Sequence, residues 1–219
     1  MGFKLILLGP PGGGKGTQAE FIKKRYDLFH ISTGDILREA IKNGSPVGLK
    51  AKRYMDAGEL VPDETVGEII EEKLKEDDVK EMFLLDGFPR TVKQVEILDQ
   101  ALEHVGSQID CAFFIDLDEE EIVRRLTGRR VCSSCGALYN VTFKPPRIDA
   151  TCDQCGGDLI QRKDDSENVI RERLSIYRTE TLPIINIYDA RGIMVRLDGS
   201  RGSEEVQRKI VAHLSEKRK

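Results

Sequence analysis

The chain has 219 residues, of which 39% are hydrophobic and 33% charged, and its formal net charge is −4 at neutral pH. This length can bury one substantial α/β core with an inserted piece or two. The acidic balance argues against a general nucleic-acid binder, which usually carries a basic excess. No apolar run is long enough to cross a membrane and no secretory signal pattern opens the chain, so we expect no membrane partner and a cytoplasmic location.

The first motif is a glycine-rich stretch from Gly9 to Thr17, directly after an apolar run over residues 3–8. A strand that ends in a glycine-rich turn and enters a helix lets backbone N–H groups converge on a phosphate. The spacing fits G-x-x-x-x-G-K, but Gly16 stands where a hydroxyl residue is usual and Thr17 comes one position later. The alternative is an ordinary Gly/Pro turn. We expect a phosphate-binding loop made by Gly12, Gly13, Gly14, Lys15, Gly16 and Thr17.

The next segment is predicted to be mainly helical. Ser32 and Asp35 have the spacing of a capping box, which explains both residues structurally and predicts a helix start. Pro62 is suited to precede the first turn of another helix. Hydrophobic periodicity gives a helix over residues 17–26, a short strand over 28–31, a short helix over 49–55 and a longer one from Asp63 to Glu76.

A four-residue apolar run over residues 82–85 is too short for a helix and predicts a central parallel strand. It leads into Asp86-Gly87-Phe88-Pro89-Arg90. After this motif we expect a helix from Thr91 with Val92, Val95, Leu98 and Leu102 inside, a buried strand over 111–115 that holds Cys111 in the core, and a basic helix from Ile122 to Arg130.

The alternation of strands and helices stops from Val131 to Asp165, where cysteines, prolines and alternating residues indicate a small β-rich insertion. A helix is then expected over residues 166–181, a break or kink at Pro183, a strand over 193–197 and a helix over 204–216. Strands separated by helices predict an α/β fold with a parallel sheet covered by helices on both faces. Right-handed crossovers would bring Gly9–Thr17 and Asp86–Arg90 to one edge of that sheet.

Asp86 is the first candidate metal ligand. A carboxylate at the end of a buried strand beside a phosphate loop can hold Mg²⁺ through water, because Mg²⁺ keeps much of its hydration shell. A role as a helix cap or turn former for the Gly-Phe-Pro that follows is the alternative reading of Asp86.

Two of these motifs carry a family resemblance. Gly9 to Gln18 is similar to the phosphate loop of adenylate kinases, with Gly13 at the variable position, and Asp86 to Arg90 resembles the second signature of that family. The resemblance spans nearly the whole chain and implies a P-loop kinase fold that transfers phosphate from ATP to AMP with Mg²⁺. It also implies a core of residues 1–31, 62–127 and 166–219, a mobile monophosphate-binding domain of residues 32–61, and a lid of residues 128–165.

The resemblance implies roles for individual residues. The matching AMP positions are Thr33, Arg38, Glu59, Leu60, Val61, Gly87, Phe88, Pro89, Arg90, Gln94, Arg162 and Arg173. Those for catalysis are Lys15, Arg90, Arg125, Arg129, Arg162 and Arg173, and those for ATP add Arg129, Leu138, Tyr139 and Arg201 to the phosphate loop. Gln94 offers both a donor and an acceptor to the adenine edge. Because an amide can flip, the sequence does not fix AMP over other monophosphates.

The cysteines of the insertion form two pairs, Cys132–Cys135 and Cys152–Cys155, each with two residues between the cysteines and a glycine after them. Four thiolates close a tetrahedral Zn²⁺ site with no open position, so the expected role is structural. Iron is an alternative metal, and disulfides would be unusual in a reducing cytosol. Many bacterial adenylate kinases carry a zinc lid of this kind.

Two other functions were considered. A nucleotide-switched module whose zinc ribbon docks nucleic acid is disfavoured by the acidic charge and by the lack of aromatics interleaved with basic residues in the insertion. A kinase for UMP or CMP fits the long lid and Gln94 less well. The expected protein is therefore a monomer that binds ATP, AMP and ADP and no nucleic acid.

Overall fold

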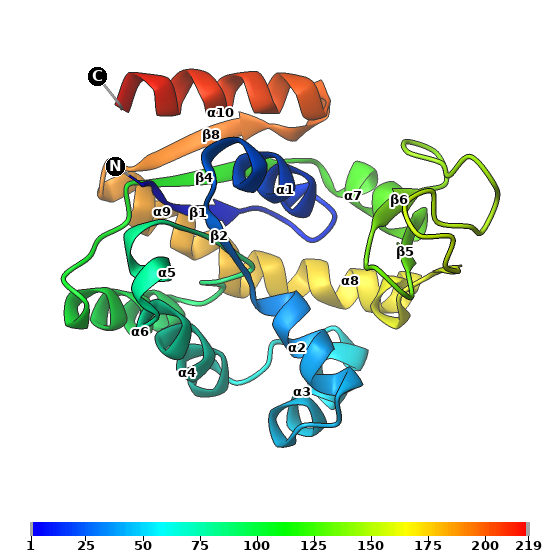
Figure 1. Cartoon of the computed structure of the whole chain (residues 1–219), viewed down its shortest axis with the longest axis horizontal. Coiled ribbons are helices and arrows are strands. Elements are labelled where there is room, and N and C mark those ends of the chain that lie inside the picture. The colour runs from blue at the N-terminus through cyan, green and yellow to red at the C-terminus, as the bar shows by residue number, and fades with distance from the viewer. Residues whose placement is uncertain (1, 218–219) are drawn as a thin grey trace.

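A parallel sheet with strand order β2-β3-β1-β4-β8 lies at the centre of the computed structural model, which describes residues 2–217 (Figure 1). Its register sets Ser32 of β2 and Leu7 of β1 level with Asp86 of β3, so the loops after these three strands open at one edge. The parallel sheet expected from the sequence is confirmed. The strands are β1 Lys4–Leu8, β2 Phe29–Ser32, β3 Phe83–Asp86, β4 Cys111–Asp116 and β8 Met194–Asp198.

Helices cover both faces of the sheet, because alternate residues of the buried strands point to opposite sides. Leu5 and Leu7 pack in a cluster with α1 (Lys15–Tyr26) and α10 (Ser203–Lys217). Ile6 and Leu8 pack on the other side, against α4 (Asp63–Leu74), α6 (Val92–His104) and α9 (Leu182–Ala190). Figure 1 shows these two helical layers.

Two helices follow β2 and extend away from the sheet. Ser32 caps α2 (Thr33–Lys42) by accepting from the Asp35 amide, as the capping-box spacing predicts. The second, α3 (Pro46–Ala57), begins three residues earlier than expected, because Ser45 caps it and Pro46 occupies its first position. The two helices pack closely: a Cβ on Gly48 would lie 2.1 Å from the Ala40 carbonyl oxygen.

Two sequence predictions need correction here, and one helix was not predicted. A short helix, α5 (Asp77–Glu81), was not expected. Val92 is 45% exposed rather than buried, because it opens α6 outside the apolar stripe that Val95 and Leu98 carry. Arg129 and Arg130 lie in a strand, not in a helix, since α7 (Glu119–Thr127) ends at Gly128 and the chain then pairs in a sheet.

The insertion is β-rich, as predicted. Its antiparallel sheet has the order β6-β5-β7, formed by β5 Arg129–Cys132, β6 Leu138–Asn140 and β7 Leu159–Ile160. A 3₁₀ turn, Lys163–Asp165, returns the chain to the core.

The long helical stretch after the insertion runs through α8 (Glu167–Ile176), a π-helical turn (Tyr177–Thr181) and α9. The expected discontinuity at Pro183 takes the form of this π turn, in which the Leu182 amide reaches the Tyr177 carbonyl. Such turns widen a helix by one residue and are frequent at functional sites. Within residues 2–217, no helix is long and apolar enough to span a membrane.

Candidate functional site

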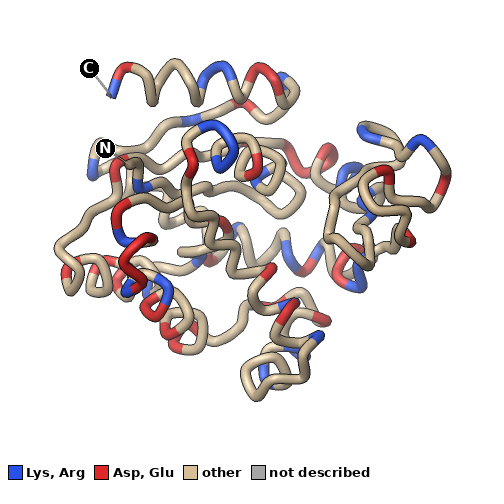
Figure 2. Tube along the Cα trace, in the orientation of Figure 1, with Lys and Arg blue, Asp and Glu red and all other residues tan. Residues whose placement is uncertain are grey.

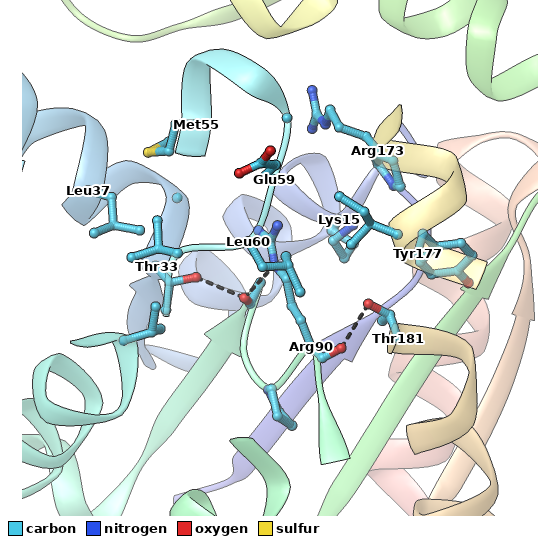
Figure 3. Close-up of a pocket in the computed structure, with 18 of the residues that line it drawn as sticks. Lys15, Thr33, Leu37, Met55, Glu59, Leu60, Arg90, Arg173, Tyr177 and Thr181 are labelled. Carbon is cyan, nitrogen blue, oxygen red and sulfur yellow. Dashed lines mark hydrogen bonds between the residues drawn. The ribbon is translucent and has the colours of Figure 1, made fainter. Parts of the chain in front are cut away.

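A pocket opens at the carboxyl edge of the sheet, between α2, α3 and α8 (Figure 3). Apolar side chains form one part of its wall and polar side chains the other, which suits a ligand with a flat base and a charged end. The apolar residues include Leu37, Met55, Leu60, Val61 and Val66, and the polar ones include Lys15, Thr33, Arg38, Glu59, Arg90, Gln94, Asp164 and Arg173.

The glycine-rich loop contributes Gly9, Pro11 and Lys15 to the lining of this pocket. Gly12 adopts φ +75°, and a Cβ there would lie 2.8 Å from Leu126 Cγ, so the loop needs glycine at this position. Gly13 N donates to the Pro10 carbonyl at 3.0 Å and tightens the turn. Across the loop, a Cβ on Gly16 would lie 3.5 Å from Leu138 Cδ1, so strand β6 of the insertion reaches the loop.

Lys15 folds back onto its own loop. Its Nζ donates to the carbonyl oxygens of Gly9 and Pro10, both at 2.8 Å. Burial lowers the pKa of Lys15 to about 8, although the Asp86 carboxylate opposes this shift. A charged amine that rests on neutral carbonyls gains a stronger partner when an anion enters the loop.

The Asp86–Arg90 turn presents one carbonyl to two donors. Thr33 Oγ1 donates to the Gly87 carbonyl at 2.9 Å, and Arg90 Nε donates to the same oxygen at 2.8 Å (Figure 3). Thr181, from the π turn, donates to the Arg90 carbonyl at 2.9 Å. The Arg90 guanidinium is thereby held at the pocket wall. Within the turn, Phe88 and Pro89 are buried.

Gln94, on the first turn of α6, is held at three atoms. Its backbone N–H donates to Thr91 Oγ1 at 3.1 Å. Its side-chain Oε1 accepts from the Arg90 backbone N–H at 2.7 Å, and its Nε2 donates to Asp63 Oδ1 at 2.8 Å. Gln94 is only 2% exposed, yet it lines the pocket. Gln94 is therefore a buried residue of the site and not a solvated residue of the helix surface.

Two arginines converge on a buried carboxylate where the insertion joins the core. Arg129 donates to both oxygens of Asp165, with its Nε at 2.7 Å and its Nη2 at 2.5 Å, and Arg173 Nη1 lies 3.3 Å from Oδ1. Asp165 is fully buried. Arg173 also donates to Asp164 at 2.7 Å. Sequence reasoning missed both carboxylates, although two acidic residues beside Arg162 at the end of an arginine-rich insertion were an available signal.

The other arginines around the pocket are incompletely neutralised. Arg38 pairs with Asp35 at 2.5 Å, whereas the buried Nε of Arg162 has no hydrogen-bond partner among the described residues. Burial, followed by repulsion from Arg38 and Arg129, lowers the pKa of Arg162. Burial also lowers the pKa values of Arg90 and Arg173. These arginines give the surroundings of the pocket a positive charge that a bound anion would neutralise.

Several residues expected at the site lie outside the lining of this pocket. Arg125 donates to Glu121 at 2.8 Å and to the Gly199 carbonyl at 3.1 Å, and Arg201 pairs with Asp198 at 3.1 Å on the surface. The other residues expected to contact nucleotides or Mg²⁺ that are absent from this lining are Gly12, Gly13, Gly14, Gly16, Thr17, Asp86, Phe88, Arg129, Leu138, Tyr139 and Arg162.

Asp86 lies at the carboxyl end of β3, with a side chain only 13% exposed. His30 of β2 approaches it, with Nε2 3.6 Å from Asp86 Oδ2. The sequence did not single out His30. A carboxylate at this position, level with the phosphate loop, fits the oxygen ligands that Mg²⁺ prefers.

The four cysteines of the insertion form a cluster away from the pocket. Their sulfurs all lie within 4.8 Å of one another, with Cys132 and Cys155 at 3.4 Å and Cys135 and Cys152 at 3.6 Å. Tetrahedral thiolates around Zn²⁺ stand about 3.8 Å apart, so the cluster fits that metal. The Tyr139 hydroxyl lies 3.5 Å from Cys152 Sγ, and this hydrogen bond lowers the pKa of the Cys152 thiol.

Comparisons with known proteins agree with this arrangement. The family model described as "Adenylate kinase" matches residues 7–193. An adenylate kinase of Clostridium tetani is 52% identical over 202 residues, which cover 92% of this chain and 94% of that protein. An adenylate kinase of Carboxydothermus hydrogenoformans is 51% identical, covering 93% and 95%, and one of Caldicellulosiruptor bescii is 48% identical, covering 96% and 98%.

Proposed function

The chain belongs to the adenylate kinase family, whose enzymes transfer a phosphoryl group from ATP to AMP to give two ADP, and from this premise we propose which of its residues carry out each part of the reaction. The pocket of Figure 3 takes AMP, with the base against Leu37, Met55 and Val61. The glycine-rich loop takes the phosphates of ATP, with Leu138 of the insertion above it.

The observation that carries this division is the excess positive charge around the pocket. Six basic side chains stand near five carboxylates in the described structure, and burial lowers the pKa of several of the cations, which an anionic ligand would reverse. The basic residues are Lys15, Arg38, Arg90, Arg129, Arg162 and Arg173, and the carboxylates are Asp35, Glu59, Asp86, Asp164 and Asp165.

The AMP phosphate that attacks is already ionised, so the reaction needs no general base. Catalysis then rests on alignment, charge stabilisation and exclusion of water. Arg38 and Arg90 donate bidentate hydrogen bonds to the AMP phosphate. The charge on the phosphoryl group during its transfer is stabilised by Lys15, Arg129, Arg162 and Arg173. The family resemblance assigns Arg125 to catalysis and Arg201 to ATP binding.

Two metals belong to this proposal. Mg²⁺, held through water at Asp86, would neutralise part of the polyphosphate charge when it arrives with ATP. Zn²⁺ held by the four cysteines would stabilise the insertion and has no open position for substrate.

Residues 32–61 and 128–165 are the segments we propose to move as a monophosphate-binding domain and a lid. The protein is proposed to act as a cytoplasmic monomer without a nucleic-acid partner. The supports for this are a thiol cluster suited to a reducing compartment and the mixture of positive and negative residues along the chain (Figure 2).

The test is a coupled assay of ADP formation from ATP and AMP, with the variant Arg90→Ala. Because Arg90 lies in the AMP pocket, we expect the KM for AMP to rise by roughly tenfold or more and the KM for ATP to change far less. The matched control is Arg191→Ala, which removes a guanidinium paired with Asp99 at 2.5 Å, outside the pocket. Equal losses for both substrates in Arg90→Ala would refute the division of the site.

A further inference from the structure

The amide of Gln94 has a defined orientation. A glutamine amide can present its oxygen and nitrogen in either order, and each order matches a different base edge. The AMP pocket therefore needs something besides Gln94 to choose a base. The two groups that hydrogen-bond the amide, the Arg90 backbone N–H and the Asp63 carboxylate, supply that choice.

Each of these two contacts is compatible with only one orientation of the Gln94 amide. The Arg90 backbone N–H can only donate, and it faces Oε1 at 2.7 Å. The Asp63 carboxylate can only accept when ionised, and its Oδ1 faces Nε2 at 2.8 Å. A flipped amide would set an N–H against the Arg90 N–H and an oxygen lone pair against the Asp63 carboxylate. Both hydrogen bonds would be lost, and the second would become a repulsion in a site where Gln94 is 2% exposed.

The Gln94 amide, although it is held in one orientation, can still form hydrogen bonds with a ligand. An amide nitrogen carries two N–H groups and Asp63 uses one of them, while the oxygen has two lone pairs and Arg90 uses one. The remaining donor and acceptor are available to a base in the pocket that Gln94 lines. They match the edge of a base that pairs a ring-nitrogen acceptor with an exocyclic amino donor.

We propose that Asp63 is a positioning residue that fixes the order of the Gln94 amide and thereby selects monophosphates of amino bases over those of keto bases. Adenine and cytosine present an amino group beside a ring-nitrogen acceptor, whereas guanine and uracil present a carbonyl oxygen beside a ring N–H. A keto base in the same pose requires the flipped amide. This proposal rests on the assignment of the pocket to AMP, and it leaves the choice between adenine and cytosine to the size of the pocket.

Asp63 acts through Gln94 rather than on the substrate. It opens helix α4 and does not line the pocket, whereas Val66, one turn further along, does. The neighbouring Glu64 makes a parallel link between the same two helices, since it pairs with Lys93 of α6. Glu64 therefore provides a control that loses an α4–α6 contact without touching the amide.

The test compares Asp63→Asn, Asp63→Ser and Glu64→Gln with the unchanged enzyme, using AMP, CMP, GMP and UMP as acceptors for ATP. An asparagine or serine side chain can donate as well as accept, so it tolerates either order of the Gln94 amide. We expect the ratios of kcat/KM for AMP over GMP and AMP over UMP to fall by about tenfold in both Asp63 variants. The ratio for AMP over CMP should stay nearly constant, and Glu64→Gln should leave all ratios unchanged.

Where turnover with a keto base is too slow to measure, calorimetry of the four monophosphates gives the ratios of their dissociation constants, which should shift in the same direction. A fall of less than about threefold in the AMP over GMP ratio of both Asp63 variants, or an equal loss with all four acceptors, overturns the positioning role. Failure of the unchanged enzyme to form ADP from ATP and AMP would instead refute the proposed function, so the two failures are distinguishable.

Discussion

At the scale of single residues, Lys15 of the phosphate loop is arranged in the free protein so that an anionic ligand would stabilise its charge. Its ammonium group rests on the carbonyls of Gly9 and Pro10, and burial lowers its pKa to about 8. Below pH 8 the free protein therefore holds a charge that is poorly solvated. A polyphosphate that enters the loop would offset that cost and raise the pKa again.

Proton uptake on ATP binding measures this change. At pH 8.5 most of the free Lys15 would be neutral, so binding should take up roughly three quarters of a proton, whereas at pH 6.5 this residue should contribute almost none. Calorimetry in buffers of different ionisation enthalpy reports the number. Lys15→Met should abolish the uptake and lower kcat by roughly 10²-fold or more. Lys23→Met, on the exposed side of the same helix, is the matched control, and near-normal turnover in Lys15→Met would contradict the loop assignment.

At this scale the sequence and the structure contribute different information. The loop glycines and Asp86 could be singled out because their spacing carries the chemistry, whereas Gln94 was indicated only by the family resemblance. Asp63 could not, because it lies 31 positions before Gln94 and the two meet only when α4 packs beside α6. The orientation of an amide depends on such partners and is not encoded in its own neighbourhood along the chain.

Among the elements, the buried strands were the most predictable. Runs such as residues 82–85 and 111–115 are apolar, short and bounded by turns, and each forms a strand at nearly the expected bounds. The basic segment over residues 122–130 was assigned wholly to a helix because its local pattern stays helical through Arg130. The switch to strand at Arg129 comes from pairing with β6, whose residues lie about ten positions further along the chain.

Metal removal tests the element built around the cysteines. We expect chelation to lower Tm by at least about 5 °C, because four thiolates brought together lose the metal that joins them. Turnover at moderate temperature should remain largely intact once Mg²⁺ is restored, since the cysteines do not line the pocket. Metal analysis of the unchanged protein should give one Zn²⁺ per chain. Cys135→Ser should reproduce the loss of Tm, and Ser133→Ala, an exposed neighbour, should not.

Loss of turnover in the chelated but folded protein would contradict this structural role and would place the metal in the mechanism.

For the whole molecule, the notable feature is that two segments far apart in the sequence, residues 32–61 and 128–165, each contact the core beside the pocket. Gly58, at the end of α3, lies so close to α8 that a Cβ there would be 2.7 Å from Val169 Cγ1. On the other side, Leu138 of the insertion reaches Gly16 of the phosphate loop. The β-rich segment could be singled out from its residues and the other segment only through the family resemblance, but neither of these contacts could be predicted, because they depend on how the elements pack in three dimensions.

A bisubstrate mimic with two adenosines joined by five phosphates should collect the contacts of both nucleotides. We expect it to bind far more tightly than ATP or AMP alone and to slow hydrogen exchange of backbone amides in residues 32–61 and 131–165. The exchange of core strand β4 serves as the internal control, because it is already buried. Tight binding with unchanged exchange in both segments would contradict the closing motion and leave the phosphate site standing.

The link between Arg129 and Asp165 has a consequence for how this protein can change over time. These residues lie near the two ends of residues 128–165, the proposed lid. They are 36 positions apart, and Arg129 donates two hydrogen bonds to Asp165. The segment between them is thus a loop whose two ends are held together by this ion pair. Its length and contents can vary with little effect on the register of the central sheet, because the closure cost of a loop grows only slowly with length. We therefore expect that the segment between Arg129 and Asp165 can be shortened or exchanged while the strands of the central sheet keep their pairing.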